Sequence, residues 1–154
     1  MPESTPSEAV IQAWARLVKA QHKVLRAVEA DLNKAGFPPL AWYDVLLALR
    51  RAQGKGLRHL EIEAQLLLAQ HNVSRLVDRL EKNGLVERRR AIEDGRGQLV
   101  SITPNGRDLL RRMWPTYRAA IARHVGRKLG AETQAKALAA LLGQLIDENA
   151  ASSS

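Results

Sequence analysis

Residues 72–83 constrain the fold more than any other part of the chain, because they form an amphipathic helix with a defined end. Apolar side chains recur here at the i, i+3, i+4, i+7 spacing of a core-facing helix side. These side chains belong to Val73, Leu76, Val77 and Leu80. The opposite side is polar and mostly basic, and it carries Ser74, Arg75, Asp78, Arg79 and Lys82. Gly84 ends the helix, since glycine readily adopts the left-handed conformation that follows a helix end.

Two runs rich in β-branched residues follow this helix directly. They span residues 86–92 and 98–102, and the Glu-Asp-Gly-Arg-Gly segment between them has the composition of a hairpin tip. A polar-faced helix followed at once by an arginine-tipped β-hairpin is the layout of a winged helix-turn-helix.

These motifs closely resemble the MarR family of bacterial transcription regulators. The resemblance is carried by Asn72-Val73-Ser74-Arg75-Leu76-Val77-Asp78-Arg79-Leu80-Glu81, by Gly84-Leu85-Val86, by the Asp94-Gly95-Arg96 wing and by the Ile102-Thr103-Pro104-Asn105-Gly106 exit. It implies a mainly α fold with a small β-hairpin wing, in a single domain over residues 1–154. The winged helix-turn-helix would span about 40–103, with dimerisation helices at about 7–36 and 104–149.

The charge of the chain is concentrated in one region. The net charge is +8, and residues 50–112 hold 14 Lys or Arg against 8 Asp or Glu. A basic surplus confined to one region favours a polyanionic partner such as DNA over a uniformly solvated surface. We expect double-stranded DNA to be that partner.

The composition also excludes several kinds of site. The chain contains no cysteine, which excludes disulfides and cysteine-ligated zinc. His59 and His124 have no set of partner residues that suggests a metal, and we expect no metal and no cofactor. No apolar run approaches the length of a membrane span, and the N-terminus lacks a signal-peptide pattern. We therefore expect a cytoplasmic protein.

Helical periodicity covers most of the remaining sequence. We expect helices at about 7–35, 40–52, 104–125 and 131–148. Ser7 and Thr103 can cap two of these helices at their N-termini, and Pro104 suits the first helical position. Pro115 predicts a kink, because it removes one backbone hydrogen bond from the helix interior.

Residues 57–68 are ambiguous, because their local alternation of apolar and charged residues reads as a strand. The resemblance implies a short strand there and then a helix at about 60–67. Leu60 and Ala69 occupy positions where the family usually has Ser or Thr caps. We therefore expect both helices of the helix-turn-helix to begin without a side-chain acceptor at these positions, unless other groups compensate.

The N-terminal end of the recognition helix is where base edges are read in the major groove. Arg75 is the first candidate for direct readout, since arginine donates two hydrogen bonds to guanine. Asn72 and Ser74 would contact both bases and phosphates, and Arg79 would contact phosphate. An alternative is that Arg75 and Arg79 pair with Asp78 and Glu81 on a solvated face. The other candidates at this end are Gln70 and His71.

The wing adds a second set of candidates. By the resemblance, Asp94 orients Arg96, which enters the minor groove; the alternative for Asp94 is a turn cap. Arg88, Arg89 and Arg90 lie on a strand whose side chains alternate between faces, so at most two of them can face DNA. We assign Arg88 and Arg90 to phosphate contacts.

Three terminal helices carry apolar stripes that one small winged domain cannot cover, and this predicts a homodimer on a pseudo-palindromic site. The resemblance also implies a small, often aromatic or phenolic, effector that releases a repressor from DNA. Candidate pocket residues are Trp14, His22, Trp42, Tyr43 and Asp44. The alternative is that these aromatic residues belong to the core and that Asp44 caps a helix or bridges neighbouring groups.

Other functions are less well supported. Gly54-Lys55-Gly56 lacks the further glycines of a dinucleotide loop and the Gly-Lys-Ser/Thr ending of a P-loop, and no catalytic motif is present, so we expect no enzyme. An architectural DNA-binding protein would share the basic surface but would show little sequence preference and no ligand response. A protein-interaction module is disfavoured by the arginine-tipped wing.

Overall fold

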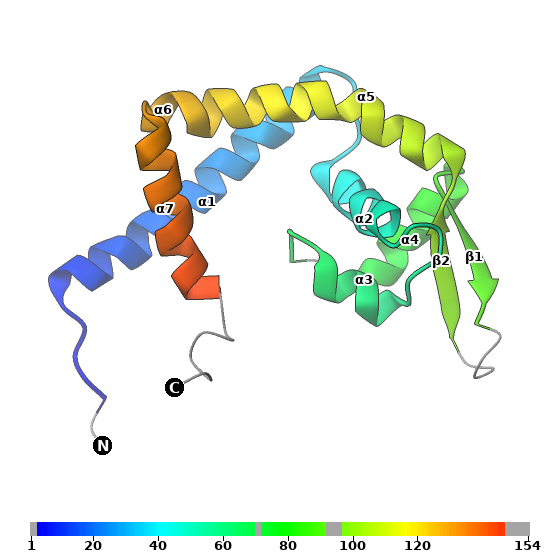
Figure 1. The fold of residues 1–154 in the computed structure, drawn as a ribbon, viewed down its shortest axis with the longest axis horizontal. Helices are drawn as coiled ribbons and strands as arrows, with labels where there is room; N and C mark the ends of the chain where they lie inside the picture. The colour runs from blue at the N-terminus through cyan, green and yellow to red at the C-terminus, as the bar shows by residue number, and fades with distance from the viewer. Residues whose placement is uncertain (1–2, 70–71, 92–96, 147–154) are drawn as a thin grey trace. The chain divides into compact units, whose positions relative to one another are not determined.

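The computed structural model describes residues 3–69, 72–91 and 97–146. They form two compact units, which we describe separately. The winged unit comprises residues 29–117, and the terminal unit comprises the described parts of residues 1–28 and 118–154. The long helices α1 (Glu8–Lys34) and α5 (Pro104–Ile121) each contribute residues to both units (Figure 1).

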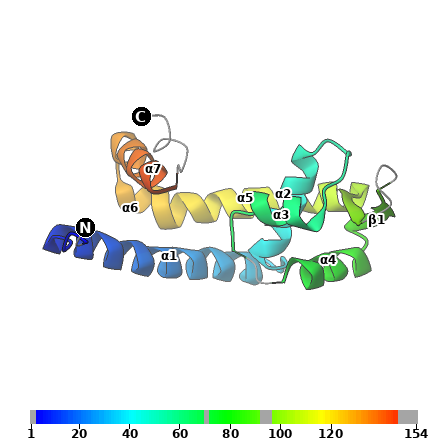
Figure 2. The same ribbon diagram turned by 90° about the horizontal axis from the view of Figure 1, so that it is seen from below.

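The winged unit contains the helices and hairpin that the sequence predicts. Its elements are α2 (Leu40–Arg51), α3 (His59–Gln65), α4 (Val73–Lys82), β1 (Val86–Arg90) and β2 (Gln98–Ile102). α4 ends at Asn83, and Gly84 follows with a φ of 71°, the left-handed conformation expected after the helix. The chain then passes directly into β1, so that α4 and the hairpin are neighbours (Figure 2).

The two strands are antiparallel, and Val86 pairs with Ile102 at one end while Arg90 pairs with Gln98 at the other. Leu57 adds an isolated bridge to Val100, with backbone bonds of 2.9 and 2.8 Å in the two directions. This bridge is the short strand that the resemblance implies before α3. Together with the helices it confirms a mainly α fold with a hairpin wing.

The core of the winged unit is built from apolar side chains of every one of these elements. The predicted stripe of α4 is buried, with Val77 and Leu80 fully inaccessible. Fully or almost fully buried side chains elsewhere in this unit are Leu32, Val45, Leu46, Leu49, Ile62, Val100, Leu110 and Met113. The polar side of α4 is thereby held outward.

The prediction that the helix-turn-helix helices would begin without a side-chain acceptor is wrong for α4, whereas at α3 the cap residue Arg58 makes no side-chain cap hydrogen bond. α4 starts at Val73, and the side-chain oxygen of Asn72 accepts a hydrogen bond from the Arg75 N–H at 3.0 Å. α3 starts at His59, where the Glu61 carboxylate accepts from the Arg58 N–H at 3.0 Å. The cap of α4 therefore lies three residues beyond Ala69, whereas at α3 a carboxylate of the first turn accepts in place of the cap residue.

The terminal unit is helical over most of its described residues. Ser7 accepts a hydrogen bond from the Val10 N–H, which confirms it as the cap of α1. After α5 come a π-helical turn η1 (Ala122–Gly126), α6 (Arg127–Leu129) and α7 (Glu132–Ile146). Pro115 lies inside α5, and the kink predicted there stays a prediction; the π-helical turn η1 follows the end of α5.

Candidate nucleic-acid interface

α4 presents one continuous exposed side. Asn72, Ser74, Arg75, Asp78 and Arg79 are all exposed, whereas the four apolar residues of the same helix are buried. The helix can present this side to a partner without losing its core contacts. Long basic and short polar side chains on such a surface can donate to both phosphate oxygens and base edges.

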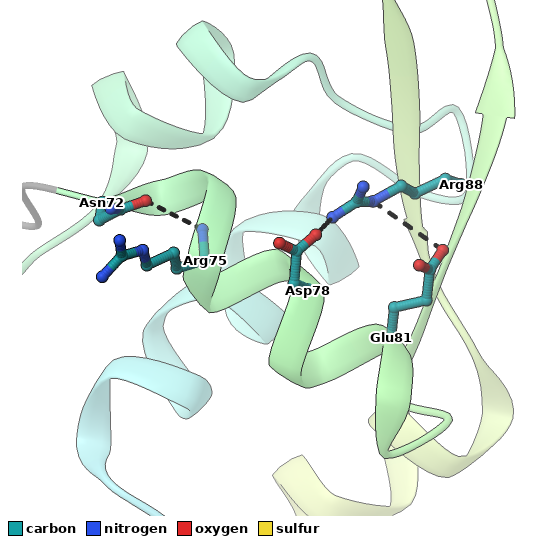
Figure 3. Close-up of polar contacts among 5 residues, drawn as sticks. All are labelled: Asn72, Arg75, Asp78, Glu81 and Arg88. Carbon is teal, nitrogen blue, oxygen red and sulfur yellow. Dashed lines mark hydrogen bonds and ion pairs between the residues drawn. The ribbon is translucent and has the colours of Figure 1, made fainter.

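Asn72 has a structural role at the start of α4. Its Oδ1 accepts from the Arg75 N–H, which leaves its amide N–H groups as donors (Figure 3). The Arg75 side chain extends away from Asp78 toward this end of the helix (Figure 3). The base contacts assigned to these two residues remain predictions, and the geometry places both at the end of α4 where such contacts are made.

The three successive arginines of β1 have three different environments. Arg88 forms ion pairs with two carboxylates of α4, those of Asp78 and Glu81. Arg89 donates from Nη2 to the backbone carbonyls of Gly54 and Lys55, at 3.3 and 3.2 Å. Arg90 is exposed.

These contacts bear on two questions that the sequence left open: which residues pair with Asp78 and Glu81, and which arginines of β1 are available to a phosphate. Asp78 and Glu81 are paired with Arg88 rather than with the helix's own Arg75 and Arg79, in the contacts that the described residues make. Arg90 is accessible to a phosphate, whereas Arg88 already has carboxylate partners. The sequence could not reveal this pairing, because strand alternation separates Arg89 from its neighbours but does not distinguish Arg88 from Arg90.

Asp44 anchors the connection between α3 and α4. It is only 8% exposed, and its two carboxylate oxygens accept from the N–H groups of Leu67 and Leu68 at 2.9 and 2.7 Å. These bonds satisfy backbone donors in the segment that leads into the recognition helix. Asp44 therefore bridges α2 and the segment after α3, as the alternative stated. Its contact with an effector stays a prediction.

An aromatic cluster joins α2 to α5. The Tyr43 ring lies 5.0 Å from the Tyr117 ring and 6.5 Å from the Trp114 ring, measured between centroids. Trp114 and Tyr117 are one turn apart on α5, with centroids 5.8 Å apart. The sequence analysis named Tyr43 as a pocket candidate but did not name Trp114 or Tyr117. The only sequence signal for these two is their one-turn spacing, which places them on the same side of α5.

Burial raises the pKa of the Tyr117 phenol, and the nearby Asp44 carboxylate, Tyr43 phenol and Glu29 carboxylate raise it further. Burial also raises the pKa of Tyr43, against an opposing effect of Arg50 and Arg51. Both phenols are therefore protonated near neutral pH and can donate hydrogen bonds.

The other candidate pocket residues lie elsewhere. Trp42 is half-buried on α2 of the winged unit, while Trp14 and His22 are exposed on the part of α1 that belongs to the terminal unit. Four predicted DNA contacts, Gln70, His71, Asp94 and Arg96, lie outside the described residues.

Within residues 3–69, 72–91 and 97–146, no group of three or more His, Asp or Glu side chains is arranged to hold a metal ion. No helix in those ranges is both long enough and apolar enough to cross a membrane.

Two comparisons of sequence find similarity to known regulators. A sequence profile of the MarR family matches residues 35–97. YkoM, an uncharacterized HTH-type transcriptional regulator of Bacillus subtilis (strain 168), is 30% identical over 93 residues. That stretch covers 60% of this chain and 58% of YkoM, so the match spans little more than half of this curated relative.

Solved structures match over almost the whole chain. Sco3205, a MarR family transcriptional regulator from Streptomyces coelicolor in complex with DNA, is 25% identical, with a TM-score of 0.81 over 93% of this chain and 92% of that one. BpsR of Bordetella bronchiseptica, whose DNA binding is regulated by 6-hydroxynicotinic acid, is 22% identical. Its TM-score is 0.78, over 94% of this chain and 100% of that one.

Proposed function

Because this chain belongs to the MarR family of transcription regulators, we propose that it is a cytoplasmic, homodimeric repressor that binds a pseudo-palindromic operator. The family consists of DNA-binding regulators and not of enzymes. The observation that carries the proposal is the two-sided α4, whose apolar side is buried while its Arg75 and Arg79 side is exposed beside a hairpin. Sco3205, which shares this fold, has been captured on DNA.

In the proposed complex α4 lies in the major groove and the wing follows the adjacent backbone and minor groove. Arg75 reads a guanine, while Asn72 and Ser74 contact bases and phosphates near it. Arg79 and Arg90 bind phosphate, and Arg96, held by Asp94, enters a narrow minor groove. Gln70 and His71, which precede α4 in the sequence, are further candidates for these contacts.

The terminal unit supports the homodimer. Trp14 on α1 is 67% exposed, and Leu141 and Leu145 on α7 are 60% and 70% exposed. Side chains of this size gathered on two helices are unusual for the surface of a monomer and are typical of a subunit interface. A two-fold dimer presents two α4 helices to half-sites about 10 bp apart.

A small aromatic or phenolic effector is part of the proposal. BpsR responds to an aromatic acid, 6-hydroxynicotinic acid. In this chain, Tyr43 offers a protonated phenol within an aromatic cluster, and Trp42 and Asp44 lie beside it in the sequence of α2. Trp14 and His22 are the candidates from α1. A ligand that competes with the Asp44 bonds would disturb the segment that leads into α4.

The test is selection of bound sequences from a random duplex pool by the full chain, at about 0.15 M salt to suppress non-specific binding. We expect an inverted repeat, with half-site centres separated by about one helical turn. Titrating simple phenols and aromatic carboxylic acids into the complex should then release the DNA and change tryptophan fluorescence.

Two results would contradict the proposal in different ways. A pool without any enriched motif, despite salt-sensitive binding, would favour the alternative of an architectural DNA-binding protein. If an inverted repeat is enriched but no aromatic compound releases the protein from it, sequence-specific regulation would stand and the aromatic effector would be excluded.

A further inference from the structure

An ion-pair cluster connects the recognition helix to the wing. Asp78 and Glu81 are three residues apart on α4, so their side chains lie on the same side of the helix. Arg88 reaches them from β1: its Nη2 donates to Asp78 Oδ1, and its Nε lies 3.8 Å from Glu81 Oε2 (Figure 3). One guanidinium thus spans two carboxylates that are one helical turn apart.

The burial of Arg88 differs from that of its partners. The Arg88 side chain is 21% exposed, against 52% for Asp78 and 45% for Glu81. Its Nε is inaccessible to solvent and has no hydrogen-bond partner, only the longer ion pair to Glu81. A phosphate oxygen cannot reach this nitrogen while the cluster is intact.

The charges of the cluster also disfavour a phosphate at Arg88. Two carboxylates surround one guanidinium, so the three groups together carry a net negative charge. A DNA phosphate approaching them would meet repulsion and would have to displace Asp78 from Nη2. Arg90, two residues along the same strand, is exposed and makes no ion pair with any residue of the described ranges.

We propose that Arg88 is a positioning residue that fixes the wing against the recognition helix, and that Asp78 and Glu81 raise DNA affinity by holding it. The proposal rests on the proposed DNA-binding function and changes the role that the sequence suggested for Arg88. α4 and the wing contact different parts of the duplex, so their spacing decides whether both can bind at once.

The proposal predicts that Asp78→Asn changes DNA affinity in the opposite direction from the one that electrostatic repulsion alone predicts. An exposed carboxylate on a DNA-facing helix repels phosphate, so Asp78→Asn should tighten binding if Asp78 does nothing else. If Asp78 holds Arg88, the same variant weakens binding, although it removes a negative charge. This reversal separates a positioning role from simple electrostatics.

The experiment measures affinity for the selected operator as a function of salt, for wild type, Arg88→Ala, Asp78→Asn and the double variant. Contacting charged residues typically couple strongly enough to change affinity by about tenfold. We expect each single variant to lose about that factor and the double variant to lose no more. The slope of log affinity against log salt should stay at its wild-type value, because no phosphate contact is removed.

A phosphate contact at Arg88 would give a different pattern. Arg88→Ala would then lower the salt slope by about 0.9, and Asp78→Asn would bind more tightly than wild type. Effects that add in the double variant would equally overturn the proposal. Arg88→Lys serves if Arg88→Ala folds poorly: it keeps the charge but loses the planar fork, and we expect weaker binding at an unchanged salt slope.

The chain supplies a matched control. Arg112 and Asp108 form an exposed pair within α5, with Nε 2.9 Å from Oδ2. Arg112→Ala and Asp108→Asn remove the same groups from a single helix, and we expect neither to change operator affinity.

Hydrogen exchange of the β1 amides in the DNA-free protein provides an independent readout. Arg88→Ala should speed their exchange, and unchanged exchange would overturn the positioning role. A wild type that binds no duplex would contradict the proposed function alone, because the exchange measurement would still decide whether Arg88 holds the wing.

Discussion

Asp44 shows how a single buried side chain can hold a segment of the chain that is distant in sequence. It lies on α2, yet both of its oxygens bind backbone N–H groups of the segment between α3 and α4. Hydrogen bonds from amides to a carboxylate are stronger than those between neutral groups. The segment at Leu67 and Leu68 is thereby fixed relative to α2.

We predict that Asp44→Asn lowers the free energy of unfolding by about 1.5–3 kcal/mol, the range for hydrogen bonds to charged groups. The amide has one acceptor oxygen, and its NH2 group faces a backbone donor. Urea unfolding at one fixed protein concentration measures the change. Glu63→Gln, an exposed carboxylate on α3, is the control and should stay within about 0.5 kcal/mol of wild type. Equal stability of both variants would show that the Asp44 bonds do not hold the segment.

Arg75 and Arg79 permit a paired test of readout against phosphate binding. Arg75→Ala should cost about 1–3 kcal/mol of binding and relax the preference at one base pair of each half-site. Arg79→Ala should weaken binding to all sequences alike and reduce the salt slope by about 1. Repeating the sequence selection with each variant distinguishes the two. Uniform weakening by Arg75→Ala would make Arg75 a phosphate contact instead.

At the scale of elements, the start of α5 packs closely against the base of the hairpin. Thr103 caps α5: its hydroxyl accepts from the Gly106 N–H at 3.1 Å and donates to the Gly84 carbonyl at 2.7 Å. A Cβ on Gly106 would lie 2.3 Å from the Leu85 carbonyl oxygen and 2.7 Å from Ile102 Cγ1. The start of α5 therefore approaches the base of the hairpin at a distance that only glycine allows.

Gly106→Ala should destabilise the protein by about 1–3 kcal/mol, because backbone as well as side-chain atoms must move to admit the methyl group. Gly126→Ala is the matched control, since nothing lies within 4 Å of its added Cβ and the residue is helical. That control should stabilise by up to about 1 kcal/mol. Thermal unfolding of both variants checks the opposite signs, and an increase in stability for Gly106→Ala would contradict the close approach.

The sequence predicted those elements whose signals are local. α4, its glycine end and the hairpin follow from periodicity and turn residues within about thirty positions, and Thr103 was correctly identified as a cap. α3 could not be assigned from alternation alone, because residues 57–64 satisfy a strand pattern as well as a helix. The bonds of Asp44 and Arg89 join residues 23 to 35 positions apart. No local pattern specifies such partners.

At the scale of the whole molecule, several large apolar side chains of the terminal unit are exposed and form the candidate surface for the proposed homodimer. Leu138, Leu141 and Leu145 follow one another along one side of α7, and all are exposed. Covering such side chains removes apolar area from water and stabilises an assembly by roughly 25 cal/mol per Å². A homodimer built on this surface would also give the two-fold symmetry that an inverted repeat requires.

We predict that the double variant Leu141→Glu/Leu145→Glu is a monomer, because a dimer would have to bury two carboxylates per chain in an apolar interface. Ala140→Glu is the control: it adds a carboxylate to an exposed position on the other side of the same helix. Sedimentation velocity should give a monomer for the double variant and a dimer for wild type and control. The monomer should also lose most of its affinity for the inverted repeat while keeping weak binding to a single half-site, since each α4 then binds alone. A dimeric double variant with wild-type operator affinity would exclude this side of α7 from the interface.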